Sequence, residues 1–204
     1  MRTGILGGVF NPPHLGHLIC AQEALAQLDL AEVVLVPVGE APHREVEADP
    51  GAEARLELCE AAVEMDERLS CSRVEVDRPG PSYTVDTLRT LRDDRRDARE
   101  LVLLLGGDQA ADLPDWREPE DVLTLAEVAV VGRDELCPEE VRARVSGLRG
   151  AERLRFFDMP RIDISSTLVR ARVAEGLPIR YLVPPRVERL IAERGFYRAS
   201  VGAA

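Results

Sequence analysis

The sequence predicts an α/β fold, in which helices cover both faces of a doubly wound, mostly parallel sheet. Two observations predict it: short apolar runs alternate with amphipathic stretches, and three loops containing glycine or proline follow apolar runs. In such sheets the ligand-binding loops lie at the carboxyl ends of the strands. With 204 residues, the chain is expected to form one domain over 1–198, followed by a flexible tail over 199–204.

Six apolar runs are expected to be strands. They are short, and none approaches the length of a membrane span. A glycine pair ends the first of them. The expected strands are Thr3–Leu6, Val33–Val36, Cys71–Val76, Leu101–Leu105, Val128–Val131 and Leu154–Phe157.

Amphipathic stretches between and after these runs are expected to be helices that pack on the sheet. Together with the strands they predict a Rossmann-like arrangement. The expected helices are Leu15–Leu28, Ala52–Met65, Thr84–Arg92, Glu118–Leu125, Glu139–Ser146, Ser166–Ala174 and Pro185–Arg194.

Charge and composition exclude several functions. The net charge of −11 and pI of about 4.9 disfavour binding to a nucleic-acid backbone, and no segment is expected to enter a membrane. All 26 basic residues are arginine, which excludes lysine Schiff bases and the lysine of a P-loop. The four cysteines form no CxxC pair and follow no secretory signal, so a reducing, cytoplasmic location is expected.

Three loops are expected to share one crevice. Residues 39–53 (GEAPHREVEADPGAE), 78–83 (RPGPSY) and 106–116 (GGDQAADLPDW) each follow an expected strand. Because the carboxyl ends of parallel strands meet at one edge of the sheet, these loops are expected to lie together there.

The stretch GGVFNPPHLGH, residues 7–17, is expected to bind an anion. Glycines after a strand let main-chain amides approach a ligand, and a helix N-terminus favours phosphate. His14 and His17 are three residues apart, so they are expected on one face of the first helical turn. The glycine spacing fits neither a Walker A loop nor GxGxxG.

Two other interpretations of these histidines stay open. In one, a histidine caps the helix while the other packs in the core. In the other, His14, His17 and Cys20 hold a metal, although the sequence offers no clear fourth ligand.

GGVFNPPHLGH resembles the GGxFxPxHxGH signature of the HxGH nucleotidyltransferase superfamily. Four further segments, spread over almost the whole chain, are similar to the nicotinate-mononucleotide adenylyltransferase family. They are PVGEAPHR (37–44), SYTVDTL (82–88), GGDQAADLPDW (106–116) and ISSTLVR (164–170).

The resemblance implies an enzyme of NAD biosynthesis that joins ATP and nicotinate mononucleotide into deamido-NAD and releases pyrophosphate. The mononucleotide phosphate would attack directly, with no general base and no covalent intermediate. Mg²⁺ would be held by phosphates and water, without protein side chains as ligands. A bound triphosphate is expected to favour the imidazolium form of the histidines.

The resemblance also implies a set of site residues. His14 and His17 would be catalytic, with His17 at the α-phosphate and His14 at the outer phosphates. Tyr83, Thr84 and Trp116 would bind nicotinate mononucleotide, the carboxylate lying at the helix that Tyr83 and Thr84 open. ATP would be bound by Gly8, Val9, Phe10, Asn11, Arg44, Gly107, Asp108, Ile164, Ser165, Ser166, Thr167 and Arg170.

The sequence departs from the family pattern at two places. Val9 stands where serine or threonine is usual, and Ala41 and Arg44 replace a proline and a lysine. Arg44 keeps the charge but changes its shape, so its phosphate contact is in doubt. The alternative that Arg44 is an ordinary solvent-exposed loop residue stays open.

Four further residues have structural alternatives. Ser165 or Ser166 could simply cap a helix, and Asp108 could cap another. Trp116 could pack in the core instead of against a pyridine ring.

Rival functions also remain open. The same fold could use nicotinamide mononucleotide or phosphopantetheine as acceptor, or transfer a cytidylyl group to an alcohol phosphate. A module that binds ATP without turnover is another alternative. The amphipathic segment ending RLIAERGFY leaves a homodimer open.

Overall fold

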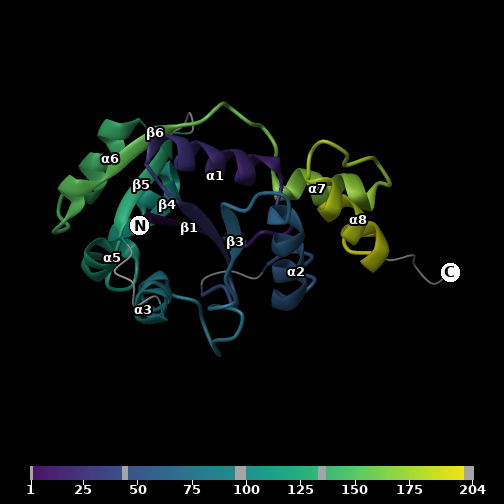
Figure 1. The fold of residues 1–204 in the computed structure, drawn as a ribbon, viewed down its shortest axis with the longest axis horizontal. Helices are drawn as coiled ribbons and strands as arrows, with labels where there is room; N and C mark the ends of the chain where they lie inside the picture. The colour runs from purple at the N-terminus through teal and green to yellow at the C-terminus, as the bar shows by residue number, and fades with distance from the viewer. Residues whose placement is uncertain (1, 43–45, 95–99, 133–136, 200–204) are drawn as a thin grey trace.

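Six strands form one sheet in the order β3-β2-β1-β4-β5-β6 in the computed structural model, which describes residues 2–42, 46–94, 100–132 and 137–199 (Figure 1). Every neighbouring pair is parallel. The chain starts in the middle of the sheet and builds first one edge and then the other, which is the order of a doubly wound fold. The predicted fold class is confirmed. The strands are β1 (Arg2–Gly8), β2 (Glu32–Pro37), β3 (Leu69–Cys71), β4 (Glu100–Gly106), β5 (Glu127–Gly132) and β6 (Arg155–Asp158).

Helices cover both faces of the sheet. In Figure 1, α1 runs along one face, while α3 and α5 lie on the other. The segments between the expected strands are therefore helical, as predicted. The α-helices are α1 (Leu15–Gln27), α2 (Ala52–Val63), α3 (Thr84–Asp94), α4 (Gly107–Ala111), α5 (Pro119–Leu125), α6 (Pro138–Val145), α7 (Ser166–Ala174) and α8 (Pro185–Arg194), and the 3-10 turns are η1 (Leu113–Asp115) and η2 (Ala151–Arg153).

Alternate side chains of each central strand enter different cores. Ile5 of β1 packs in a cluster with Leu88 of α3, whereas its neighbour Leu6 packs in a cluster with Ala21 of α1. Both faces of a parallel sheet are buried, so its strands read as continuous apolar runs and not as alternating ones. This explains why the runs in the sequence located the strands.

A third core joins α2, α7 and α8. Leu58 of α2, Val169 of α7 and Val187 of α8 are completely or almost completely buried in it. This cluster fixes α7 against the rest of the fold (Figure 1). Across the part of the chain that the structure describes, no helix is long and apolar enough to cross a membrane.

The expected strand Cys71–Val76 is wrong. The observed β3 covers Leu69–Cys71. Just after it, the Ser72 amide donates a hydrogen bond to the Leu35 carbonyl of β2. The chain then turns, with the Asp77 amide donating to the Arg73 carbonyl at 2.9 Å. Although VEV has strand-like composition, the carboxylate of Glu75 is buried and takes side-chain hydrogen bonds, which holds this segment out of the sheet.

Other differences are smaller. The last strand starts and ends one residue later than expected, at Arg155–Asp158. The loop expected over 106–116 contains α4 and η1, which are too short to give a clear periodic signal. Of the expected tail, 200–204 lie outside the described residues, and the single domain stays a prediction.

Candidate active site

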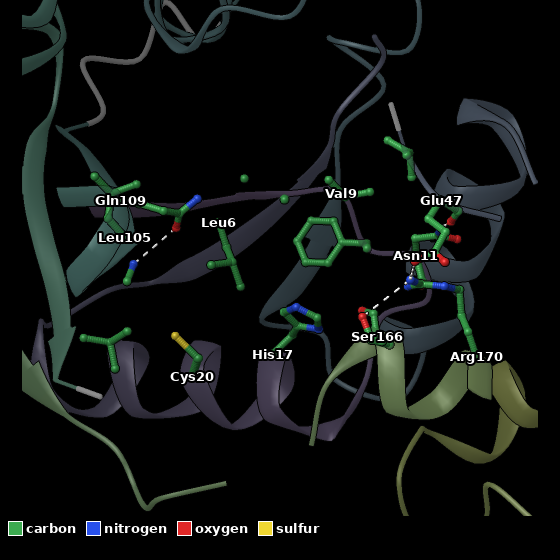
Figure 2. Close-up of a pocket in the computed structure, with 17 residues that line it drawn as sticks. Leu6, Val9, Asn11, His17, Cys20, Glu47, Leu105, Gln109, Ser166 and Arg170 are labelled. Carbon is green, nitrogen blue, oxygen red and sulfur yellow. Dashed lines mark hydrogen bonds and ion pairs between the residues drawn. The ribbon is translucent and has the colours of Figure 1, made fainter. Parts of the chain in front are cut away.

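A cavity of about 480 Å³ lies at the carboxyl ends of β1 and β4, between the first residues of α1 and α7 (Figure 2). β1 and β4 are the two strands at which the order of the sheet reverses, the usual ligand position in doubly wound folds. We call it the central cavity. Its lining is Leu6, Gly7, Gly8, Val9, Phe10, Asn11, His17, Cys20, Val46, Glu47, Leu105, Gly106, Gln109, Val131, Ser166, Thr167 and Arg170.

The imidazole of His17 is held in one tautomer. His14 is the N-cap of α1, and its main-chain amide donates to Nδ1 of His17 at 3.1 Å. Because Nδ1 accepts this bond, Nε2 carries the proton of the neutral ring and acts as a donor. The imidazolium form expected with bound ATP stays a prediction, and it would require this bond to break.

His14 is buried behind His17 and packs against its ring. The two ring centroids are 3.8 Å apart, and His14 is 4% exposed, whereas only His17 lines the central cavity. Gly16 permits this packing, because a Cβ at Gly16 would lie 3.0 Å from Cε1 and Nδ1 of His14. The His-x-Gly-His spacing thus has a steric reason.

Phe10 completes the support of His17. Its ring meets that of His17 edge to face, with centroids 5.0 Å apart. A Cβ at Gly8 would lie 3.1 Å from the Phe10 ring, so the glycine makes room for it. Gly8, Val9, Phe10 and Asn11 all line the cavity floor, as the resemblance implied.

The N-terminus of α7 forms the opposite wall. Ser165 caps the helix by accepting the Leu168 amide at 3.1 Å, so the capping alternative holds for this serine. Ser166 lines the cavity and donates to the Pro12 carbonyl at 2.8 Å. This bond ties α7 to the loop after β1.

Arg170 reaches the same loop from the second turn of α7. Its Nη1 donates to the Asn11 carbonyl at 2.9 Å, and its Nη2 lies 3.2 Å from the Glu47 carboxylate (Figure 2). The Arg170 side chain is 14% exposed and the Glu47 side chain 84%. A phosphate entering the cavity can therefore displace Glu47 from the guanidinium without opening the core.

A second cavity of about 310 Å³ adjoins the central one and shares Gly7, Gly8, Val9, Leu105 and Gln109 with it. We call it the Trp116 cavity. Tyr83, Thr84 and Trp116 all line it, as expected for an acceptor site. Trp116 also packs against the core, as the structural alternative expected, while its contact with a pyridine ring stays a prediction.

The charged groups of the Trp116 cavity are Glu75 and Arg117 among the described residues. The Arg117 guanidinium lies over the Tyr83 ring, 4.7 Å from its centroid. Burial raises the pKa of the Glu75 carboxyl, while hydrogen bonds from Thr87 and Ser82 oppose that rise.

A third cavity of about 460 Å³ contains Gly107 and Asp108, and shares Gly106 and Gln109 with the central cavity. Asp108 lies in the first turn of α4. The expected adenosine contacts are therefore placed beside the expected phosphate contacts. Gln109 lines all three cavities.

Some expected site residues lie elsewhere. His14, Ser165 and Ile164 are outside the cavity linings, and Ile164 packs against the α2, α7 and α8 core. Arg44 lies outside the described residues. In the part of the chain that the structure describes, no three His, Cys, Asp or Glu side chains are placed to hold a metal, so the triad with Cys20 is not formed.

Sequence analysis missed Gln109, Glu47 and Arg55. Gln109 follows Asp108 in the segment just after β4, and this position was the available signal. Arg55 is 1% exposed and donates to the carbonyls of Val9, Val38 and Gly39, at 3.2, 2.5 and 3.1 Å. Nothing in its sequence surroundings separates this arginine from a solvated one.

A parallel doubly wound sheet with two helix N-termini and a histidine beside cavities that share lining residues is the arrangement expected of a nucleotidyltransferase. The sequence model of the cytidylyltransferase-like family matches residues 5–172, so the chain belongs to that family.

Similar proteins identify the narrower family to which the chain belongs. A protein of Roseiflexus sp. (strain RS-1) is 42% identical over 96% of this chain and 97% of its own length, and one of Synechococcus sp. (strain JA-3-3Ab) is 38% identical over 96% and 94%. Both are named "Probable nicotinate-nucleotide adenylyltransferase". The chain belongs to the nicotinate-nucleotide adenylyltransferase family.

A solved structure shows the same fold. Plasmodium falciparum nicotinic acid mononucleotide adenylyltransferase complexed with NaAD matches with a TM-score of 0.76, over 96% of this chain and 97% of that one. The sequences are 16% identical, so this likeness concerns the fold alone.

Proposed function

We propose that the protein transfers the adenylyl group of ATP to nicotinate mononucleotide, giving deamido-NAD and pyrophosphate. One observation carries the proposal: the central cavity, walled by His17 and the α7 N-terminus, adjoins the Trp116 cavity and shares five lining residues with it. A triphosphate in the first and a pyridine mononucleotide in the second would meet at Gly8 and Val9, which both cavities share. The names of the relatives support the same substrates.

The reaction needs two phosphates brought together in line. An oxygen of the mononucleotide phosphate attacks the α-phosphorus of ATP, a new P–O bond forms, and the bond to the bridging oxygen of pyrophosphate breaks. The nucleophile is already ionised, so no base is required. Catalysis then consists of positioning and of stabilising the charge on the α-phosphate and leaving group.

His17 supplies a donor for that charge. His17 lines the central cavity, and because the His14 amide occupies Nδ1, the donor N–H available to a phosphate is at Nε2. Arg170 and the first amides of α7 would take the outer phosphates. His17 of α1 and the N-terminal part of α7 would thus hold opposite ends of the triphosphate.

Mg²⁺ fits this cavity in hydrated form. Oδ1 of Asn11 is buried and has no hydrogen-bond partner among the described residues, and Glu47 is the one carboxylate in the lining that the structure describes. An amide oxygen and one carboxylate are too few for a protein cage, but they suit the waters of an ion held by phosphates. Bound there, Mg²⁺ would neutralise charge on the triphosphate.

The direct test is release of pyrophosphate with ATP, Mg²⁺ and each candidate acceptor. Nicotinate mononucleotide should be turned over, with nicotinamide mononucleotide and phosphopantetheine much poorer. A preference for the amide would refute the assigned acceptor. No release with any acceptor would favour the module that only binds ATP.

Arg170→Met should weaken ATP binding by about 10- to 100-fold, because a charge-assisted hydrogen bond contributes about 1.5–3 kcal/mol. The KM for nicotinate mononucleotide should change little. Titration of an unreactive ATP analogue measures the dissociation constant. Arg172→Met is the matched control, since Arg172 lies on the same helix and donates to the Pro178 carbonyl, outside the cavities. Equal affinities for both variants would contradict the assigned role.

Trp116→Ala should raise the KM for nicotinate mononucleotide by about 5- to 150-fold and leave the KM for ATP nearly unchanged. Stacking of a base on an aromatic ring contributes about 1–3 kcal/mol. Trp116→Phe keeps a ring and should recover part of the loss. Initial rates at varied acceptor concentration check this, and an equal rise in both KM values would speak against a stacking site.

A cytoplasmic location and the absence of nucleic-acid and membrane partners belong to the same proposal. The four cysteines without a CxxC pair support the location, the short apolar runs speak against a membrane partner, and the net charge of −11 speaks against a nucleic-acid partner. A homodimer stays open.

A further inference from the structure

A buried polar cluster lies at the floor of the Trp116 cavity and has no part in the proposed mechanism. Glu75 and Ser82 are 8% exposed and Thr87 is 3% exposed, and all three line the cavity. Burial of polar groups lowers stability unless each finds a partner, so a cluster of this kind in a cavity floor calls for a reason.

The hydroxyl of Thr87 is the centre of the cluster. It donates to Oε1 of Glu75 at 2.7 Å and accepts from Nη2 of Arg78 at 3.0 Å. The carbonyl of Tyr83 lies 3.3 Å from the same oxygen. A hydroxyl has one proton, and the shorter bond to a carboxylate takes it. Thr87 therefore links the buried Glu75 carboxylate to the partly buried Arg78 guanidinium through one oxygen atom.

Arg78 depends on this link. Its Nε and Nη1 atoms are buried and have no hydrogen-bond partner in the part of the chain that the structure describes. Nη2 is the guanidinium nitrogen that is paired, and its partner is the Thr87 hydroxyl. Loss of that hydroxyl would leave the Arg78 side chain without its side-chain partner.

The cluster also joins two loops that border the Trp116 cavity. The Gly39 amide donates to Oγ of Ser82 at 3.2 Å, and the Ser82 amide donates to the Glu40 carbonyl at 2.9 Å. A Cβ at Gly39 would lie 2.1 Å from the Glu75 carbonyl oxygen, so the two segments are in direct contact there. The segment that leads into α3 is thus fixed against the loop after β2.

We propose that Thr87 is a positioning residue for the acceptor: by holding Glu75 and Arg78 together, its hydroxyl fixes the Tyr83–Thr84 entrance of α3, to which the proposed function assigns the acceptor carboxylate. Thr87 does not touch the reacting atoms. The inference rests on the proposed function, because it concerns the same acceptor. It predicts an effect on acceptor binding that is separate from ATP binding.

The test compares Thr87→Val, which removes the hydroxyl at nearly constant volume, with Thr87→Ser, which keeps it. Thr87→Val should raise the KM for nicotinate mononucleotide about tenfold and change the KM for ATP less than twofold. Thr87→Ser should stay within about threefold of the parent protein. Thr90→Val is the matched control, since Thr90 lies one turn further along α3 and its hydroxyl bonds the Asp86 carbonyl.

Acceptor binding can also be measured without turnover, because Trp116 is the one tryptophan of the chain. Titration of each variant with nicotinate mononucleotide, followed by tryptophan fluorescence, should give a dissociation constant about tenfold higher for Thr87→Val. Arg78→Met removes the other partner of the Thr87 hydroxyl and should show the same pattern. It replaces Thr87→Val in the test if that variant folds poorly.

Three results would overturn the inference. They are unchanged acceptor binding in Thr87→Val and Arg78→Met, an equal rise in both KM values, and no recovery in Thr87→Ser. If the parent protein neither binds nor turns over nicotinate mononucleotide, the proposed function fails first, and this inference falls with it.

Discussion

Replacing His17 by alanine should lower kcat by about 100- to 1,000-fold, the loss that follows removal of one donor to a charged transition state. The reason is geometric: His17 lines the central cavity and the His14 amide occupies its Nδ1, which leaves the Nε2–H as the donor. A donor that acts mainly in the transition state changes kcat more than the KM for ATP. Steady-state rates of pyrophosphate release measure both.

Two further variants serve as a partial rescue and as a control for this result. His17→Gln offers an amide N–H near the position of Nε2 and should recover part of the rate. Gln22→Ala is the control: Gln22 lies on the exposed side of the same helix, so its replacement should leave the rate unchanged. A His17→Ala enzyme that loses less than tenfold in kcat would contradict the role given to this ring.

Replacing Arg55 by methionine should lower the free energy of unfolding by about 3–5 kcal/mol, the usual effect of breaking a buried charged network. Arg55 is 1% exposed and pairs with Asp49 at 2.9 Å. It also donates to the carbonyls of Val9, Val38 and Gly39, which would lose these partners. Because Val9 follows β1 and Val38 follows β2, the arginine joins two loops of the site.

Urea denaturation of Arg55→Met and of the parent protein measures this difference. Arg186→Met is a matched control, because Arg186 pairs with Glu64 at a half-exposed position and should contribute less than about 1 kcal/mol. A loss below about 1 kcal/mol in Arg55→Met would show that water replaces the guanidinium at these carbonyls.

The sequence contained enough information for the sheet because its strands are buried on both faces. Runs such as Leu101–Leu105 are apolar throughout, and a central strand buried on both faces is the position in this fold that suits them. Cys71–Val76 was misassigned for the opposite reason: Glu75 is buried, but its carboxylate is satisfied by side chains of later residues, which composition does not reveal.

The site was predictable where one continuous segment forms it. Residues 7–17 and 164–170 each combine a strand or loop end with a helix start, so local rules located the cavity walls. Glu47, Gln109 and Arg55 could not be found in this way, because their positions depend on how separate loops converge. His14 shows a further limit, since spacing placed it beside His17 but did not show that it lies beneath the wall.

The most direct test of the account is a crystal structure of the protein with Mg²⁺ and an ATP analogue whose α,β-bridge is a methylene group. The account predicts the triphosphate in the central cavity, with Nε2 of His17 within hydrogen-bond distance of the α-phosphate and the first amides of α7 and Arg170 at the outer phosphates. A triphosphate bound elsewhere, or a His17 ring turned away from it, would contradict the account.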